Sequence, residues 1–254
     1  MQSYKFFKMF TLTVCTILLS SLPVIAGTPI SDRIATEVGL RAEVTKDLAL
    51  AYVLPNDLTG RTCLNGKPVR GFEGDVVEYW ANIECPYCGI REVVQAEKAN
   101  PNLCIVVRHI PSSEYGESLK KALSYEALKK FSANAANIFW DKVVPNTSLG
   151  IAAPYEGALL QAAQEAAIAP ESLGEALAKE ATALVNEDIL AAQGRIRTTP
   201  TFILAGIRFP ACDFTATELA TALGLAKEAR QGNADALEKI IRIITNGQLS
   251  EQKL

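Results

Sequence analysis

The sequence is short of two features that common functional classes need. It has one histidine, His109, which excludes histidine-rich metal sites and any mechanism that uses two imidazoles. It has no excess of positive charge, because 25 Lys and Arg face 28 Asp and Glu, and this gives no support for a nucleic-acid partner. Six cysteines among 254 residues are too few for a small disulfide-stapled fold. We therefore expect some of them to carry chemistry.

Residues 1–26 have the pattern of a secretory signal peptide. Lys5 and Lys8 precede an apolar stretch, and small residues lie at the cleavage positions before Gly27. We predict cleavage after about Ala26 and export to the periplasm. An uncleaved membrane anchor is the alternative, which the Ser and Thr residues and the terminal proline of the stretch disfavour. Cleavage removes Cys15, leaving five cysteines in a compartment where disulfides persist, and no second long apolar run follows.

Periodicity in the rest of the chain predicts an α/β protein with about half of its residues apolar, enough for a sizeable core. Strands are predicted at residues 67–70, 76–80, 103–110, 201–204 and 207–209, with a turn at Gly206 between the last two. Helices are predicted at 31–52, 86–99, 119–144, 155–168, 171–192, 216–230 and 234–245. This order describes a small mixed sheet with helices on its faces and a helical insertion between its two halves.

The CPYC motif at residues 85–88 lies where a predicted strand runs into a predicted helix. Cys85 and Cys88 are spaced to share one helical face, and Pro86 suits the first helical position. The helix dipole would favour the thiolate of Cys85, the form that attacks disulfides, whereas Cys88 would be more buried and less reactive. A structural disulfide is one alternative. A zinc site is another, but the chain offers no second Cys pair or paired histidines with matching spacing.

The segment EYWANIECPYC, residues 78–88, resembles the active-site entry of the DsbA-like thiol:disulfide oxidoreductases of the bacterial periplasm. Residues 107–111, 135–140 and 198–202 agree with further segments of that family, and the resemblance covers about residues 67–229 in the right order. It implies a thioredoxin fold and no cofactor. The implied organisation is a signal peptide at 1–26, an N-terminal helical extension at 27–66, and a catalytic domain at 67–254 with its helical insertion at about 115–195.

The resemblance also implies a cis peptide bond between Thr199 and Pro200 beside the redox-active Cys85–Cys88 pair. Thr199 could then pair with an extended substrate as an added strand, with Pro86 and Tyr87 completing the binding motif. A strand-entry proline is the alternative for Pro200. Strongly oxidising relatives usually carry histidine where this chain has Tyr87. Tyrosine supplies no cation beside the thiolate, so we expect a milder oxidant.

Three further ionisable residues bear on the chemistry of the CPYC motif: Glu84, Glu78 and the single histidine, His109. Glu84, immediately before Cys85, is expected to raise the pKa of that thiol, because a nearby anion disfavours the thiolate. Glu78 resembles the buried acid that moves protons to the inner thiol in this superfamily; a solvated or strand-end glutamate is the alternative. His109 ends an apolar strand and is interpreted as a structural histidine rather than a catalyst.

The remaining cysteines are Cys63, Cys104 and Cys212. If the sheet follows the thioredoxin order, the edge strand near Cys63 lies beside the strand that carries Cys104. A Cys63–Cys104 disulfide is then geometrically favoured over either pairing with Cys212. Three buried free thiols remain the other interpretation, because adjacency does not guarantee the required Cα separation.

The predicted activity is thiol–disulfide exchange with exported proteins that contain cysteines, as oxidase or isomerase, recharged by an unidentified membrane redox partner. The helix at 31–52 must dock somewhere, since an isolated helix of that length is marginal in water. Docking on a second copy would give a homo-oligomer and favour an isomerase, whereas docking within the chain would favour a monomeric oxidase. A non-catalytic periplasmic chaperone on the same fold and a glutaredoxin-type reductase are the alternative functions.

Overall fold

A computed structural model describes residue 58 and residues 60–112, 117–145, 152–193 and 195–246. The predicted signal peptide and the helix predicted at 31–52, with any oligomer that it would form, lie outside these residues. Within the described part of the chain, no helix combines the length and the apolar character needed to cross a membrane.

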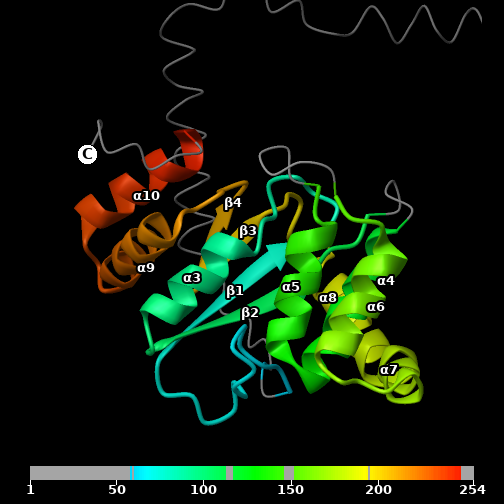
Figure 1. Cartoon of the computed structure of the whole chain (residues 1–254). Coiled ribbons are helices and arrows are strands. Elements are labelled where there is room, and N and C mark those ends of the chain that lie inside the picture. The colour runs from blue at the N-terminus through cyan, green and yellow to red at the C-terminus, as the bar shows by residue number, and fades with distance from the viewer. Residues whose placement is uncertain (1–57, 59, 113–116, 146–151, 194, 247–254) are drawn as a thin grey trace, which may run out of the picture. The chain divides into compact units, whose positions relative to one another are not determined.

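The described residues form one four-stranded mixed sheet in the order β2-β1-β3-β4 (Figure 1). The strands are β1 (Asp75–Ala81), β2 (Leu103–His109), β3 (Thr201–Leu204) and β4 (Ile207–Pro210). The pair β1–β2 is parallel, and the pairs β1–β3 and β3–β4 are antiparallel. All seven residues of β2 are buried, as its nearly continuous apolar sequence predicts.

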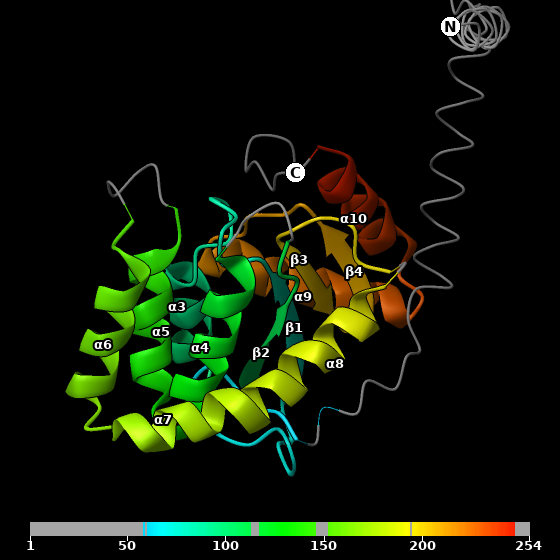
Figure 2. The same ribbon diagram turned by 90° about the vertical axis from the view of Figure 1, so that its right-hand side faces the viewer.

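Helices cover both faces of this sheet. The helices are α3 (Arg91–Ala99), α4 (Ser118–Phe131), α5 (Ala133–Val143), α6 (Tyr155–Glu165), α7 (Pro170–Ala176), the π-helical turn η1 (Leu177–Ala181), α8 (Thr182–Ala192), α9 (Ala216–Arg230) and α10 (Ala234–Asn246). Helices α3 and α9 lie on one face and α8 lies on the other (Figures 1 and 2). Helices α4 to α7 form a helical block beside the β2 edge, which is the insertion that the sequence predicts.

Tight backbone geometry fixes two turns at the sheet. Ala205 and Gly206 have φ values of 46° and 79°, the left-handed pair that a two-residue hairpin between β3 and β4 requires. Gly74 precedes β1, and a Cβ there would collide with the backbone carbonyl of Asn102. A larger residue at position 74 would therefore push apart the starts of β1 and β2.

Two sequence predictions about elements are wrong in detail. The edge strand expected at 67–70 is only an isolated bridge between Thr62 and Pro68, because proline cannot donate to a strand ladder. The single helix expected at 119–144 is two helices, α4 and α5. Ser132 separates them: its extended backbone ends α4, and its side chain accepts a hydrogen bond from the Ala135 amide as the N-cap of α5.

The core-facing side of α4 also differs from the expected apolar face. Leu119 and Phe131, two apolar residues whose four-residue spacing predicts the helix at 119–144, are exposed, whereas the polar residues Lys121, Glu126 and Lys129 are buried. The spacing of apolar residues does not identify the buried face of α4, because its buried polar side chains have partners inside the protein. One of these partners is the Thr62 carbonyl, which accepts a hydrogen bond from Lys129.

Candidate redox site

The site begins where β1 ends. Asn82 is buried, and its side-chain oxygen accepts hydrogen bonds from the Glu84 amide (2.9 Å) and from the Ser118 hydroxyl at the start of α4 (2.7 Å). Its backbone carbonyl accepts from the Cys85 amide (2.9 Å). These bonds turn the chain sharply after the strand. They place the CPYC motif at the end of the central strand of the sheet.

The CPYC motif is a turn and not the first turn of a helix, which corrects the sequence prediction. The Cys88 amide donates to the Cys85 carbonyl (3.0 Å), and α3 begins only at Arg91. Helix formation is delayed because two side chains take the carbonyls that helical amides would use. Trp140 donates its indole N–H to the Cys88 carbonyl (2.8 Å), and the Tyr79 hydroxyl donates to the Gly89 carbonyl (3.2 Å).

The two thiols of the motif have opposite environments. Cys85 is partly exposed beside the exposed Pro86 and Tyr87, whereas Cys88 is completely buried, and both are free thiols in the structure. The pKa of Cys85 is lowered to about 6, first by a hydrogen bond from the Cys88 side chain and then by the Tyr87 amide and Thr199, against the opposing effect of partial burial. Burial, and next the hydrogen bond with Cys85, raise the pKa of Cys88.

The loop before β3 brings Thr199 to the exposed thiol. The Thr199–Pro200 peptide bond is cis, and the Cys85 sulfur lies 3.5 Å from the Thr199 carbonyl oxygen. The Thr201 hydroxyl donates to the Thr198 carbonyl (2.7 Å), which fixes the loop at the start of the strand. The structure thus brings together Cys85, Cys88 and Thr199, three of the predicted site residues, from segments more than a hundred positions apart.

The structure places Glu78 on the opposite face of the sheet from the thiol loop. Side chains alternate along β1, so Glu78 shares a face with Trp80, and its carboxylate lies 3.6 Å from the Arg108 guanidinium. Tyr79 points to the other face, where its hydroxyl meets the thiol loop. The β1 residue beneath the CPYC motif is therefore Tyr79, and the contacts of Glu78 do not favour the proton-relay role expected for it.

Glu84 is paired with a buried cation. Its carboxylate lies 2.5 Å from the Lys121 ammonium, which also donates to the Val143 carbonyl (3.2 Å). The field that Glu84 exerts on Cys85 is therefore partly neutralised. The sequence could not show this compensation, because Lys121 lies 37 positions away on α4.

His109 has a buried setting consistent with the structural interpretation. Its Nε2 atom lies 2.9 Å from the carboxylate of Glu126, and its ring packs against Tyr125 and Trp140. Its backbone amide donates to Asp188 (2.8 Å), a fully buried carboxylate that also pairs with Arg61 at 2.7 Å. These contacts tie β2, α4 and α8 together.

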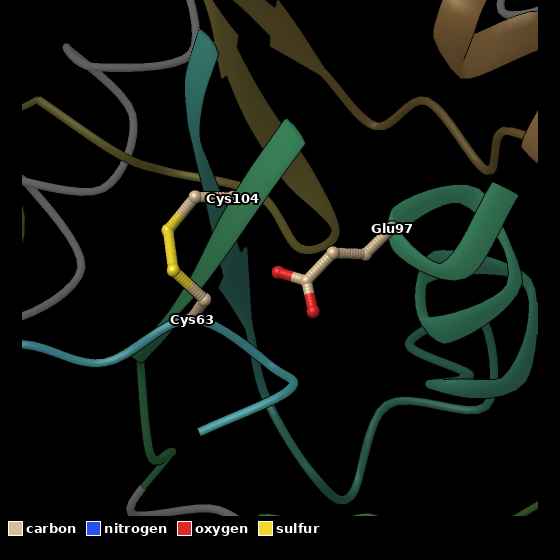
Figure 3. Close-up of side chains that lie close together, drawn as sticks. All are labelled: Cys63, Glu97 and Cys104. Carbon is tan, nitrogen blue, oxygen red and sulfur yellow. A yellow bond between two sulfur atoms is a disulfide. The ribbon is translucent and has the colours of Figure 1, made fainter. Parts of the chain in front are cut away.

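The second cysteine pair is a disulfide. Cys63 and Cys104 are bonded, with a Cα–Cα distance of 5.0 Å, and both are completely buried (Figure 3). Glu97 lies close to the two sulfurs, but its carboxylate accepts hydrogen bonds from the amides of Ile105 (2.7 Å) and Leu64 (3.2 Å). The group has the residue types of a metal site. Its two sulfurs are, however, bonded to each other in the disulfide.

Cys212 is the remaining described cysteine and is a buried free thiol. Its sulfur donates to the Pro210 carbonyl (3.4 Å), and burial raises its pKa to about 12. A thiol with this pKa is overwhelmingly protonated near neutrality and therefore unreactive.

The sheet order, the thiol loop after β1 and the helical block between β2 and β3 define a thioredoxin-like fold with a helical insertion. No protein-family model matches the sequence, and no curated protein matches it either. Among solved structures, the thiol-disulfide exchange protein alpha-DsbA2 from Wolbachia pipientis is similar with a TM-score of 0.50 and 14% identity, over 77% of this chain and 98% of that one.

ScsC from Proteus mirabilis, in a transitional conformation, is similar with a TM-score of 0.50 and 12% identity, over 88% of this chain and 96% of that one. A thioredoxin-like oxidoreductase from Silicibacter pomeroyi is 23% identical, with a TM-score of 0.49, over 64% and 90% of the two chains. The likeness to the first two structures confirms the predicted fold class.

Proposed function

We propose that this chain is a periplasmic thiol:disulfide oxidoreductase that exchanges disulfides with exported proteins through Cys85 and Cys88. The observation that carries the proposal is the contrast between these thiols: Cys85 is accessible with a pKa of about 6, and Cys88 is buried beside it with a raised pKa. The ionised thiol of Cys85 attacks first, and the neutral thiol of Cys88 reacts in the second step.

The exchange needs only sulfur chemistry. With the pair reduced, the Cys85 thiolate attacks a substrate disulfide, forms a mixed disulfide and expels one substrate sulfur as a thiolate. Attack by Cys88 on Cys85 then releases the second substrate sulfur and leaves the pair oxidised. Attack by another substrate thiol regenerates Cys85 instead, and the substrate is isomerised. With the pair oxidised, the reverse sequence oxidises a substrate dithiol.

The substrate would bind along the loop before β3. Thr199 has its carbonyl at the Cys85 sulfur, so an extended peptide pairing with this backbone would place its own cysteine next to the reacting thiol. Tyr87, with 66% of its surface exposed, offers an apolar contact for such a peptide. These features favour a peptide segment over a small molecule as substrate.

The discriminating experiment offers the purified protein reduced ribonuclease and scrambled ribonuclease in parallel. Rapid reactivation of the reduced enzyme alone identifies an oxidase, and reactivation of the scrambled enzyme identifies an isomerase. Reactivation of neither contradicts both roles and favours a specialised reductase or the chaperone alternative. A Cys85→Ser variant with full activity would favour the chaperone, since holding an unfolded chain does not need the thiolate.

Export and assembly are part of the proposal. Mass determination of the protein recovered from a periplasmic fraction should show a chain that begins after about Ala26. Deletion of residues 31–52 tests whether that segment joins two copies, because the deletion would convert an oligomer into a monomer in sedimentation equilibrium. The membrane protein that recharges the pair would be trapped as a mixed disulfide with Cys85.

A further inference from the structure

Tyr79 occupies the space directly beneath the thiol loop. Only 1% of its surface is exposed, and its ring stacks on Phe202 of β3 with a centroid distance of 4.8 Å. Its hydroxyl donates to the Gly89 carbonyl at 3.2 Å, immediately after the CPYC motif. The phenol is therefore held rigidly by packing, while its polar end faces the residues that do the chemistry.

The same hydroxyl also interacts with Cys88, the residue that precedes Gly89 in the chain. Burial first, and then the charges of Cys88 and Asp213, raise the pKa of Tyr79 well above its ordinary value, and a hydrogen bond to Cys88 contributes to that shift. Tyr79 therefore stays protonated at any physiological pH. Its single O–H can be directed to the Gly89 carbonyl or to the Cys88 sulfur by rotation about the bond that joins the oxygen to the ring.

The resolving step of the proposed exchange needs such a donor. Cys88 is completely buried, so its thiolate would form in a dry setting where an unsolvated anion is costly. In the mixed disulfide, Cys85 is bonded to substrate, and its sulfur no longer carries a thiolate for Cys88 to hydrogen-bond. The Cys88 thiolate must then be stabilised by groups that stay in place.

We propose that Tyr79 is a positioning residue that stabilises the Cys88 thiolate in the resolving step by turning its O–H from the Gly89 carbonyl to the Cys88 sulfur. The inference rests on the proposed function, since it concerns the second half of that reaction. It assigns to a neutral hydroxyl the place beneath the thiol pair that the family resemblance implies for the carboxylate of Glu78.

The step balances without an external reagent. Cys88 loses its proton to solvent, and its thiolate attacks the Cys85 sulfur of the mixed disulfide. The bond between Cys85 and the substrate sulfur breaks, and that sulfur leaves with the electron pair and takes up a proton from solvent. Substrate is reduced and the Cys85–Cys88 pair is oxidised. The proton of Tyr79 stays on its own oxygen throughout.

The test separates the two half-reactions with 5,5′-dithiobis(2-nitrobenzoate), which reports each step by release of a coloured thiolate. Cys85 attacks first and releases one equivalent, and resolution by Cys88 releases the second. In Tyr79→Phe, which keeps the ring, we expect the first phase to stay within about twofold of wild type and the second to slow about tenfold, the loss expected for a hydrogen bond to an anion. The pH profile of the second phase should also move upward by about one unit.

Tyr125→Phe is the matched control. Tyr125 is equally buried, but its hydroxyl donates to the Asn137 side chain (3.2 Å) instead of to the thiol loop. Both phases should match wild type in this variant, even if its melting temperature falls as far as that of Tyr79→Phe. A purely structural role for Tyr79 would lower the melting temperature without moving the pH profile of the second phase.

Two results would overturn the inference. One is a second phase in Tyr79→Phe that keeps the rate and the pH profile of wild type. The other, which does not depend on that variant folding, uses 3-fluorotyrosine at position 79: its more acidic hydroxyl should accelerate the second phase about twofold, and an unchanged rate contradicts the proposal. Absence of the first phase in wild type would instead refute the proposed function itself.

Discussion

The described residues include two cysteine pairs, of which Cys85 and Cys88 are free thiols and Cys63 and Cys104 form a disulfide. Cys85 and Cys88 lie in a turn at the end of β1, with one sulfur accessible and hydrogen-bond donors directed at it. Cys63 and Cys104 join the segment before the sheet to β2, and both are completely buried. The carboxylate of Glu97, which lies close to this second pair, accepts hydrogen bonds from backbone amides.

The comparison teaches that access and stabilisation of the thiolate separate a reactive pair from a structural one. A disulfide is opened by a thiolate that must reach one of its sulfurs in line. The Cys63–Cys104 bond offers no exposed sulfur in the folded protein, whereas Cys85 offers one beside a binding loop. The first pair is placed for exchange and the second for cross-linking.

The largest effect should come from removing the resolving thiol. In Cys88→Ser, mixed disulfides between Cys85 and substrate proteins should persist roughly a hundredfold longer, because intramolecular release is lost. Non-reducing electrophoresis of a periplasmic extract measures them. Cys104→Ser is the comparison variant: it leaves Cys63 as a free but buried thiol, which should trap nothing. Equal trapping by both variants would abolish the distinction between the two pairs.

The second effect concerns stability. The double variant Cys63→Ala/Cys104→Ala opens a cross-link that spans 41 residues. Chain-entropy arguments predict a fall of about 4 kcal/mol in the free energy of unfolding. Urea titration measures this, with the two-phase exchange rates of the folded protein expected to stay unchanged. Cys212→Ala removes one buried sulfur without opening a cross-link and should cost about 1 kcal/mol. A double variant no less stable than Cys212→Ala would show that the disulfide is not a structural cross-link.

A third prediction sets the pH range of the reactive pair. Since the pKa of Cys85 is about 6, its thiolate predominates above pH 6 and is lost as the pH falls through that value. Alkylation of the reduced protein by iodoacetamide should rise about tenfold per unit below pH 6 and level off above it. Peptide mapping should find the label on Cys85 and not on Cys212, whose pKa is raised to about 12. A midpoint near the ordinary value of about 8.5 would contradict the assigned environment.

Much of this architecture could be predicted from the sequence because its signals are local. Runs of apolar residues mark β1 and β2, Gly206 marks the hairpin, and the bounds of α9 and α10 follow their periodicity to within a residue. The CPYC motif was recognisable from its place between a predicted strand and a predicted helix, whereas the loop at Thr199–Pro200 was assigned to the site by the resemblance to the DsbA-like family. Local patterns thus identified the thiols, and the resemblance identified the loop that meets them.

The predictions that failed depend on partners far away in the chain. The delayed start of α3 follows from Trp140 and Tyr79 capturing two carbonyls, and no pattern within residues 85–99 encodes that. Distant packing also determines which face of β1, that of Glu78 or that of Tyr79, meets the motif. Because side chains alternate along a strand, Glu78 and Tyr79 must point to opposite faces, but only the packed sheet shows which of these faces meets the motif.

The smallest predicted effect tests the electrostatic setting of the reactive thiol. Glu84→Gln should lower the midpoint of the Cys85 thiolate titration by less than one unit, because it removes a nearby anion and leaves the Lys121 cation uncompensated. Thiolate absorbance measures the midpoint, and Glu180→Gln, which breaks an exposed ion pair with Lys130 far along the chain, is the control and should leave it unchanged. An unchanged or higher midpoint in Glu84→Gln would contradict the expected field of Glu84 at the thiol and would mean that the acidity of Cys85 is set by its hydrogen bonds.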